Sequence, residues 1–203
     1  SDQSQIFLNS EGDSWYKRNK SAIETAKASA DVSFILQTLK GSSFEIQDLL
    51  EVGCSSAAKL NLLASSFSAS GSGIDPSSLA IQQGAKQYPD LDLRVGLASR
   101  LPFEADKFDL VFFGFCLYLV PPDKIELAMN EALRVLRPKR FIALTDFDSG
   151  IEMTVPYKHV EGLMSYKRDY MQLLNKLSNV TLIAKHSFSN SGNFFVEDKN
   201  NRV

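Results

Sequence analysis

The feature that most limits what this chain can fold into is an apolar run, residues 49–52, that contains one acid, Glu51, and leads into a turn of small residues beginning at Gly53. A second predicted strand ends on Asp75, about 20 residues beyond that glycine. An α/β sheet builds an adenosine site in this way, because the tight turn lets the backbone approach the ligand and the distal acid accepts hydrogen bonds from ribose hydroxyls. The pattern therefore predicts a nucleoside cofactor before any other residue is considered.

Apolar runs bounded by turn residues alternate with amphipathic stretches along the rest of the chain. Strands are expected at residues 48–52, 69–74, 93–95, 108–113, 141–147 and 180–188, and helices at residues 14–19, 23–39, 57–67, 77–87, 123–136 and 163–177. This alternation predicts an α/β fold, a Rossmann-like, doubly wound, mostly parallel sheet with helices on both faces. We expect residues 1–45 to form an N-terminal helical cap and residues 46–203 the core, within one globular domain. The segment 148–161 is long for a connection and is expected to be a lid or a binding loop.

Charge and hydropathy exclude several classes of function. The chain has 203 residues and a net charge of −2, so it lacks the basic face that an electrostatic nucleic-acid binder needs. Its longest apolar run, residues 110–120, is shorter than the ~20 residues that span a bilayer, and its first residues are polar. We therefore expect a cytoplasmic protein without a membrane or nucleic-acid partner. Cys54 and Cys116 form no ligand-spaced pair, so both are expected to pack as small apolar side chains and no metal site is predicted.

The motifs taken together resemble one enzyme family, the class I S-adenosylmethionine-dependent methyltransferases. The family's order and spacing are matched by residues 51–55, Asp75, and residues 101–103, 108–111 and 131–138. The resemblance covers roughly residues 46–147 and implies S-adenosylmethionine as cofactor, with transfer of its methyl group to a small polar acceptor. The cofactor-binding residues expected on this basis are Glu51, Gly53, Cys54, Ser55, Asp75, Pro76, Leu97, Ala98, Phe115, Trp15, Arg18 and Asn19.

A narrower resemblance lies largely outside that region. Residues 11–19, 114–119 and 165–170 look like bacterial methyltransferases associated with gene clusters for surface polysaccharides and pseudaminic-type sugars. This resemblance implies that the acceptor is a sugar or a sugar derivative, methylated on a hydroxyl or an amine.

The chain departs from the family pattern in three places. The usual turn with three glycines keeps only Gly53, so a positive φ angle at Ser55 or Ala57 would be strained. Leu97 stands where the family often has an aspartate, so adenine would be held by apolar packing and by the backbone or Ser99. The family's fold normally ends in a further antiparallel strand, which we expect to be truncated or missing here, leaving an open sheet edge.

The residues expected to act on the acceptor follow the fourth strand and the long segment. Tyr118 lies just past the fourth strand, where this fold holds donor and acceptor, and His159 lies in the segment 148–161, from which a general base could reach an acceptor hydroxyl. We assign a catalytic role to both. The predicted substrate-binding residues are Tyr157, Tyr166, Lys167 and Tyr170.

Two other functions and several structural roles stay open. An NAD-dependent oxidoreductase shares the glycine turn and the distal acid, although its pyrophosphate needs the extra glycines more than adenosylmethionine does. A non-catalytic subunit that binds S-adenosylmethionine would also show this pattern. Trp15 could equally be a core residue, and the helix predicted to carry Tyr166 and Tyr170 could simply dock on the sheet.

Overall fold

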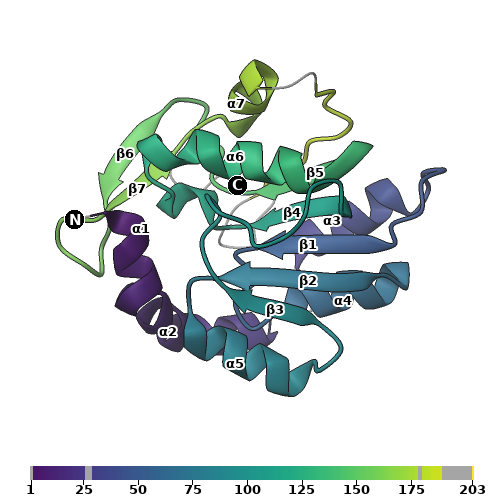
Figure 1. Ribbon diagram of the computed structural model, residues 1–203. Helices are drawn as coiled ribbons and strands as arrows, with labels where there is room; N and C mark the ends of the chain where they lie inside the picture. The colour runs from purple at the N-terminus through teal and green to yellow at the C-terminus, as the bar shows by residue number, and fades with distance from the viewer. Residues whose placement is uncertain (1, 26–28, 178–179, 189–202) are drawn as a thin grey trace.

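A single parallel sheet organises the molecule. The computed structural model describes residues 2–25, 29–177, 180–188 and 203 (Figure 1). Five strands pair in the order β3-β2-β1-β4-β5, and all the pairings are parallel. Their bounds are β1 Asp48–Val52, β2 Ser70–Asp75, β3 Asp92–Val95, β4 Phe108–Gly114 and β5 Leu136–Thr145. The strand order reverses between β1 and β4, and a doubly wound sheet opens its ligand crevice at the carboxyl ends of the strands beside such a point.

Helices cover both faces of this sheet. One face packs against α3 (Ala30–Leu39) and α4 (Ala58–Phe67), and the other against α6 (Pro122–Val135) and α7 (Tyr170–Leu177). A further helix, α5 (Ser78–Gln87), contacts β2 and β3. The inner strands β1 and β4 are buried almost throughout, because parallel strands covered on both sides leave no face for polar residues. The predicted fold class is confirmed, and β1 has the predicted bounds.

Two segments far apart in the sequence lie together at the carboxyl ends of the strands (Figure 1). The first is the N-terminal segment, α1 (Gln3–Ile6), a π-helical turn (Phe7–Glu11) and α2 (Gly12–Thr25). The second is an antiparallel hairpin of β6 (Met153–Pro156) and β7 (Met164–Lys167). The ligand crevice is therefore covered from two sides.

The hairpin corrects two sequence expectations. The segment 148–161 is not irregular throughout, because it contains β6, and residues 164–167 form β7 rather than the start of a helix. The burial of Ser165 and Lys167 alternates with their half-exposed neighbours, which is the period of a strand, so the helical spacing of Tyr166 and Tyr170 is misleading. A helix over residues 23–39 was also wrong, since α2 ends at Thr25 and α3 begins at Ala30, with residues 26–28 outside the described part.

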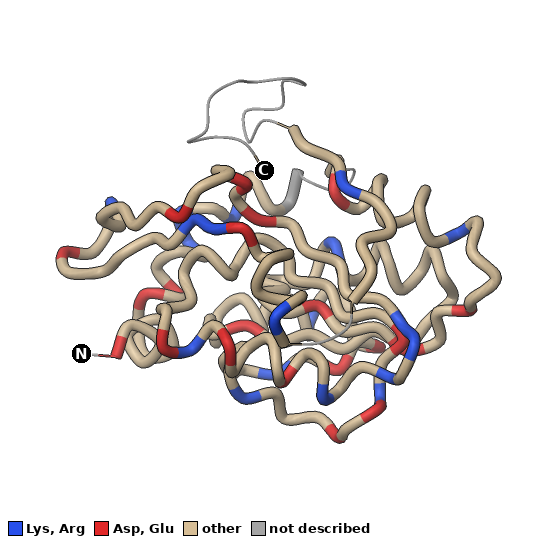
Figure 2. Tube along the Cα trace, turned by 90° about the horizontal axis from the view of Figure 1, so that it is seen from above, with Lys and Arg blue, Asp and Glu red and all other residues tan. Residues whose placement is uncertain are grey.

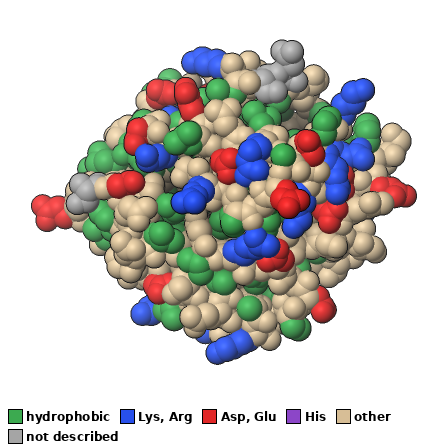
Figure 3. Space-filling view, in the orientation of Figure 1, with side chains coloured by type: hydrophobic (Ala, Val, Ile, Leu, Met, Phe, Trp, Pro, Cys, Tyr) green, Lys and Arg blue, Asp and Glu red, His purple; other side chains and the backbone are tan. Residues whose placement is uncertain are grey.

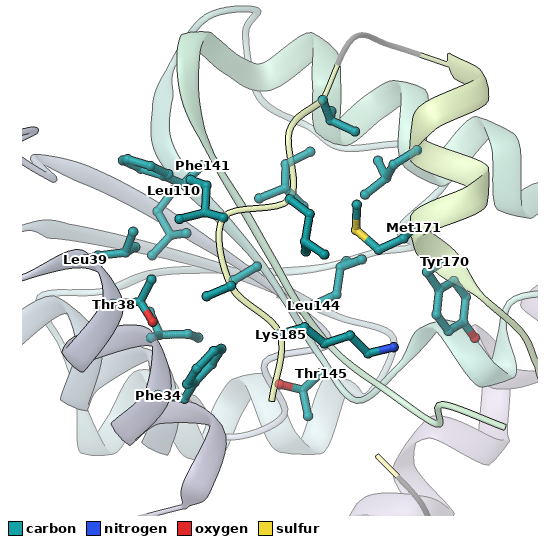
Figure 4. Close-up of a pocket in the computed structure, with 18 of the residues that line it drawn as sticks. Phe34, Thr38, Leu39, Leu110, Phe141, Leu144, Thr145, Tyr170, Met171 and Lys185 are labelled. Atoms are coloured by element: carbon teal, nitrogen blue, oxygen red, sulfur yellow. The ribbon is translucent and has the colours of Figure 1, made fainter. Parts of the chain in front are cut away.

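The predicted strand over residues 180–188 is not formed. These residues run beside the outer edge of β5, between α3 and α7, where they border a largely apolar groove of about 740 Å³ (Figure 4). Lys185 pairs with Asp148 at 2.9 Å, and Phe188 exchanges two backbone hydrogen bonds with Val203. Within the described residues, no strand pairs with the outer edge of β5.

The amino ends of three strands are joined by ion pairs on the side away from the crevice. The buried carboxylate of Asp109 accepts hydrogen bonds from the Gln47 and Asp48 backbone and from Arg137 and Arg140. These donors hold the pKa of Asp109 below its usual value despite its burial. Elsewhere acidic and basic side chains are interspersed along the chain and over the face shown (Figures 2 and 3).

Candidate cofactor-binding site

The turn between β1 and α4 has the backbone conformation of a glycine-rich turn although it contains one glycine. Gly53, Ser55 and Ala57 all have positive φ angles, of 78°, 49° and 65°. A Cβ atom on Gly53 would lie 2.5 Å from the Cβ of Cys116, so only glycine fits there. Ser55 and Ala57 adopt a conformation that costs L-residues about 1–2 kcal/mol each. The strain expected from the sequence is therefore present, and the turn keeps its shape.

Asp75 ties this turn to the end of β2. Its two carboxylate oxygens accept hydrogen bonds from the backbone N–H of Ser55 at 2.9 Å and of Ser77 at 2.8 Å. The Ile74 carbonyl accepts from Gly53 and Cys54 N–H at 2.8 and 3.1 Å. Burial raises the pKa of Asp75 to about 6, against the effect of these two donors. Because each carboxylate oxygen has a second lone pair, Asp75 can still accept from two hydroxyls.

Glu51 is a buried carboxyl that is only partly satisfied. The residue is 2% exposed, and burial raises its pKa to about 8, with Lys59 acting in the opposite direction. Its Oε1 lies against Gly114, and a Cβ atom added at Gly114 would lie 2.5 Å from that oxygen. Its Oε2 is buried without a hydrogen-bond partner among the described residues. Such an oxygen suits a hydrogen-bond donor on a ligand.

A cavity of about 100 Å³ lies beside Asp75, between the sheet and the N-terminal segment. Its walls include six of the predicted cofactor residues, namely Trp15, Gly53, Asp75, Pro76, Leu97 and Ala98. Ser99 also lines it, together with Ser4, Phe7 and Gly12 from the N-terminal segment. No carboxylate replaces the missing aspartate at Leu97, so this wall is mainly apolar. Cys54 and Ser55 belong to the adjoining turn, whereas Glu51, Phe115, Arg18 and Asn19 do not line this cavity.

Arg18 and Asn19 are engaged elsewhere. Arg18 pairs with the buried Glu11 and donates to the Tyr157 hydroxyl at 3.1 Å, and the Asn19 amide donates to the Trp15 carbonyl at 2.8 Å. The sequence pattern placed both residues on the helix that covers the cavity, but it did not predict the partners that they bond to.

Asp13, which the sequence interpretation missed, docks the N-terminal segment onto α5. Its carboxylate accepts from the Ser77 hydroxyl at 2.7 Å and from the Leu79 N–H at 3.0 Å, with Ser78 Oγ at 3.3 Å. These donors lower the pKa of Asp13, and α2 begins so close to Pro76 and Ser77 that a Cβ on Gly12 would lie 3.0 Å from Ser77 N. A carboxylate at a helix N-terminus is a favourable cap, but its partner lies too far along the sequence to be recognised from it.

An aromatic cluster lies at the carboxyl ends of β4 and β5. The rings of Phe115, Tyr118 and Phe147 pack edge to face, with centroids 4.9–5.4 Å apart. Lys167 reaches over from β7, and its Nζ lies 3.9 Å from the centroid of the Phe147 ring. Burial raises the pKa of the Tyr118 phenol, and the nearby Trp15 side chain opposes that rise. Lys167 and Tyr118 thus meet at this cluster, with Trp15 beside Tyr118.

Asp146 is a second residue that the sequence interpretation missed. Its carboxylate accepts from the backbone N–H of Leu117, Tyr118 and Phe147 at 2.8, 3.2 and 2.8 Å. Burial raises the pKa of Asp146 to about 7, and these donors and Lys167 oppose that rise. Asp146 follows the apolar second half of β5, residues 141–144, as Asp75 completes β2, and that position was the available signal.

The other predicted acceptor residues are dispersed. His159 is exposed in the hairpin turn with its ring against Tyr157, at a centroid distance of 5.3 Å. Tyr170 packs in the core at the start of α7, and its hydroxyl donates to the Tyr166 carbonyl at 3.1 Å. Tyr166 lies on β7 and Tyr170 on α7, so the two do not share a helix.

The comparisons with known proteins agree with this geometry. Residues 49–139 match the family described as methyltransferase domain. A demethylmenaquinone methyltransferase from Beutenbergia cavernae is 33% identical over 86 residues, which are 42% of this chain and 33% of that protein. The chain therefore spans about a third of the length of that relative.

Solved structures share the fold of this chain. The PH0226 protein from Pyrococcus horikoshii superimposes with a TM-score of 0.58 at 21% identity, over 84% of this chain and 83% of that chain. A geranyl diphosphate methyltransferase in complex with GPP and sinefungin gives a TM-score of 0.51 at 19% identity, over 58% of this chain and 45% of that chain. In the described part of the chain, the helices are too short or too polar to cross a membrane.

Proposed function

We propose that this protein transfers a methyl group from S-adenosylmethionine to a small polar acceptor, a sugar hydroxyl or amine. The observation that carries the proposal is the β1–α4 turn. Its strained residues are held in the glycine-like conformation by the Ser55 N–H bond to Asp75, within the segment that matches the methyltransferase domain. A chain that kept this strain without a ligand to accommodate would gain nothing from it.

The residues present fit the cofactor. Asp75 has free lone pairs for two ribose hydroxyls, Leu97 and Ala98 offer an apolar wall for adenine, and Glu51 Oε2 offers a buried acceptor for a donor group. When bound, the cofactor supplies an electrophilic methyl group on a positively charged sulfur.

The chain's own contribution to the reaction is orientation and exclusion of water. Alignment of two bound reactants supplies about 7–11 kcal/mol of the barrier reduction. Phe115, Tyr118 and Phe147 form a rigid apolar floor at the strand ends, and Asp146 fixes the Leu117–Tyr118 backbone through two N–H groups. We propose that Tyr118 contacts the acceptor, whereas the exposed His159 is not retained as the base.

Titration calorimetry with S-adenosylhomocysteine tests the cofactor assignment. The wild-type protein should bind it, and Asp75→Ala should weaken binding about 10- to 100-fold, because a hydrogen bond to a charged group contributes ~1.5–3 kcal/mol. Asp92→Ala, at the opposite end of the neighbouring strand β3, is the matched control and should bind like wild type. Preference for NAD over S-adenosylhomocysteine would favour the oxidoreductase. Unchanged affinity in Asp75→Ala would reject the ribose assignment.

A further inference from the structure

The cavity beside Asp75 is bordered by the N-terminal segment and is smaller than an ordinary cofactor site. Four of its lining residues, Ser4, Phe7, Gly12 and Trp15, come from that segment. Its volume of about 100 Å³ compares with roughly 300–1,000 Å³ for ordinary small-molecule sites. A ligand of nucleoside size would therefore press against this segment unless the segment moved.

The N-terminal segment is bonded to the hairpin at two buried points. Gln3 donates from Nε2 to the carbonyls of Leu119 and Met164 at 2.8 and 2.9 Å, and its Oε1 accepts from Met164 N–H at 3.0 Å. Met164 is the first residue of β7, and Leu119 lines the cavity. All the hydrogen-bonding groups of this buried amide except one lone pair are thus used to join the two segments.

Tyr157 makes the second connection. It follows β6 and is 8% exposed, its hydroxyl donates to Glu11 Oε1 at 2.9 Å, and Arg18 donates to that hydroxyl. Its ring also packs on Phe7, with centroids 5.8 Å apart. A hydroxyl engaged in this way is unsuited to bind the acceptor, which revises the role predicted from the sequence.

We infer that the N-terminal segment and the β6–β7 hairpin close as one unit, with Tyr157 and Gln3 as positioning residues that join them. Cofactor binding then orders the hairpin, although no hairpin residue lines the cavity. Since the hairpin brings Lys167 to the aromatic cluster, loading of the cofactor also completes the acceptor side. This inference rests on the proposed function for the identity of the ligand but not for the mechanical connection.

Hydrogen exchange with S-adenosylhomocysteine as the probe tests the coupling. In the wild type, the ligand should slow exchange in the β1–α4 turn and also in the hairpin, residues 153–167, by about 10-fold or more. Tyr157→Phe removes one of the two connections and keeps the ring, so it should reduce the slowing in the hairpin several-fold and leave that in the turn. Gln3→Met should act in the same way, and Tyr88→Phe at the far end of α5 should behave like wild type.

The outcomes separate the inference from the proposed function. Protection of the turn without protection of the hairpin would overturn the coupling and leave the cofactor assignment intact. Absence of any protection would contradict the cofactor assignment, and the ligand-free proteins would then decide the coupling. Without ligand, Tyr157→Phe should speed exchange in both segments about 10-fold, because it breaks a buried bond between them. Acceleration confined to the hairpin, or none, would refute it.

Discussion

Ser55 combines two unfavourable features, and replacing it should stabilise the protein. Its φ angle of 49° costs a residue with a Cβ about 1–2 kcal/mol. Its hydroxyl is buried without a hydrogen-bond partner among the described residues, which costs about 1–3 kcal/mol. Glycine removes both penalties but loses about 0.5–1 kcal/mol of chain entropy on folding. Ser55→Gly should therefore raise the free energy of unfolding by about 1–4 kcal/mol.

Urea unfolding of the ligand-free protein measures this gain in the free energy of unfolding. In thermal unfolding, the melting temperature should rise by about 2–4 °C for each kcal/mol. Ser55→Ala isolates the hydroxyl and should gain about 1–3 kcal/mol. Ala57→Gly is the contrasting variant, because its relief of strain at φ 65° is offset by loss of a fully buried methyl group, about 0.8 kcal/mol, and by the same entropy. It should stay close to wild type. A Ser55→Gly protein no more stable than wild type would show that the turn is not strained.

The pH dependence of stability and the recognition of the adenine base should both follow from the geometry of the site. Burial raises the pKa of Glu51 to about 8, so the folded protein binds more protons than the unfolded chain between about pH 4.5 and 8 and loses stability as the pH rises through that window. Glu51→Gln should reduce this loss, measured by denaturant titrations at pH 6 and 8.5. An unchanged pH dependence would contradict the raised pKa of Glu51. The inosine analogue of S-adenosylhomocysteine should bind with an affinity within about 10-fold of the adenosine form, because no carboxylate at Leu97 accepts from the adenine amino group. Much weaker binding of the analogue in calorimetry would show that Ser99 or another group recognises that amino group.

Local patterns predicted the parts of the fold that depend on local physics. β1 and β4 are recognised because strands buried on both faces must be apolar throughout, and the turn after β1 is recognised because close backbone approach needs small residues. The strand register then places Asp75 beside Gly53 without further information. These elements carry the cofactor half of the site.

The acceptor half could not be predicted, because it depends on pairings between distant segments. The Gln3 side chain bonds to Leu119 and Met164, which lie 116 and 161 positions further along the chain. The Tyr157 hydroxyl bonds to Glu11, which lies 146 positions earlier. A buried glutamine or glutamate near the beginning of a chain carries no local sign of such a partner. The four-residue strands β6 and β7 are likewise defined by each other rather than by their own composition.

An amide NMR titration with S-adenosylhomocysteine tests the central claim most directly, because it locates the ligand without an acceptor. The largest shifts should fall on residues 53–57, Asp75, Ser77, residues 97–99 and the Trp15 indole N–H, which line the cavity beside Asp75 or belong to the adjoining turns. Backbone amides along the outer edge of β5, which border the 740 Å³ groove, should not respond. Shifts confined to that groove, or none at saturating ligand, would contradict the account.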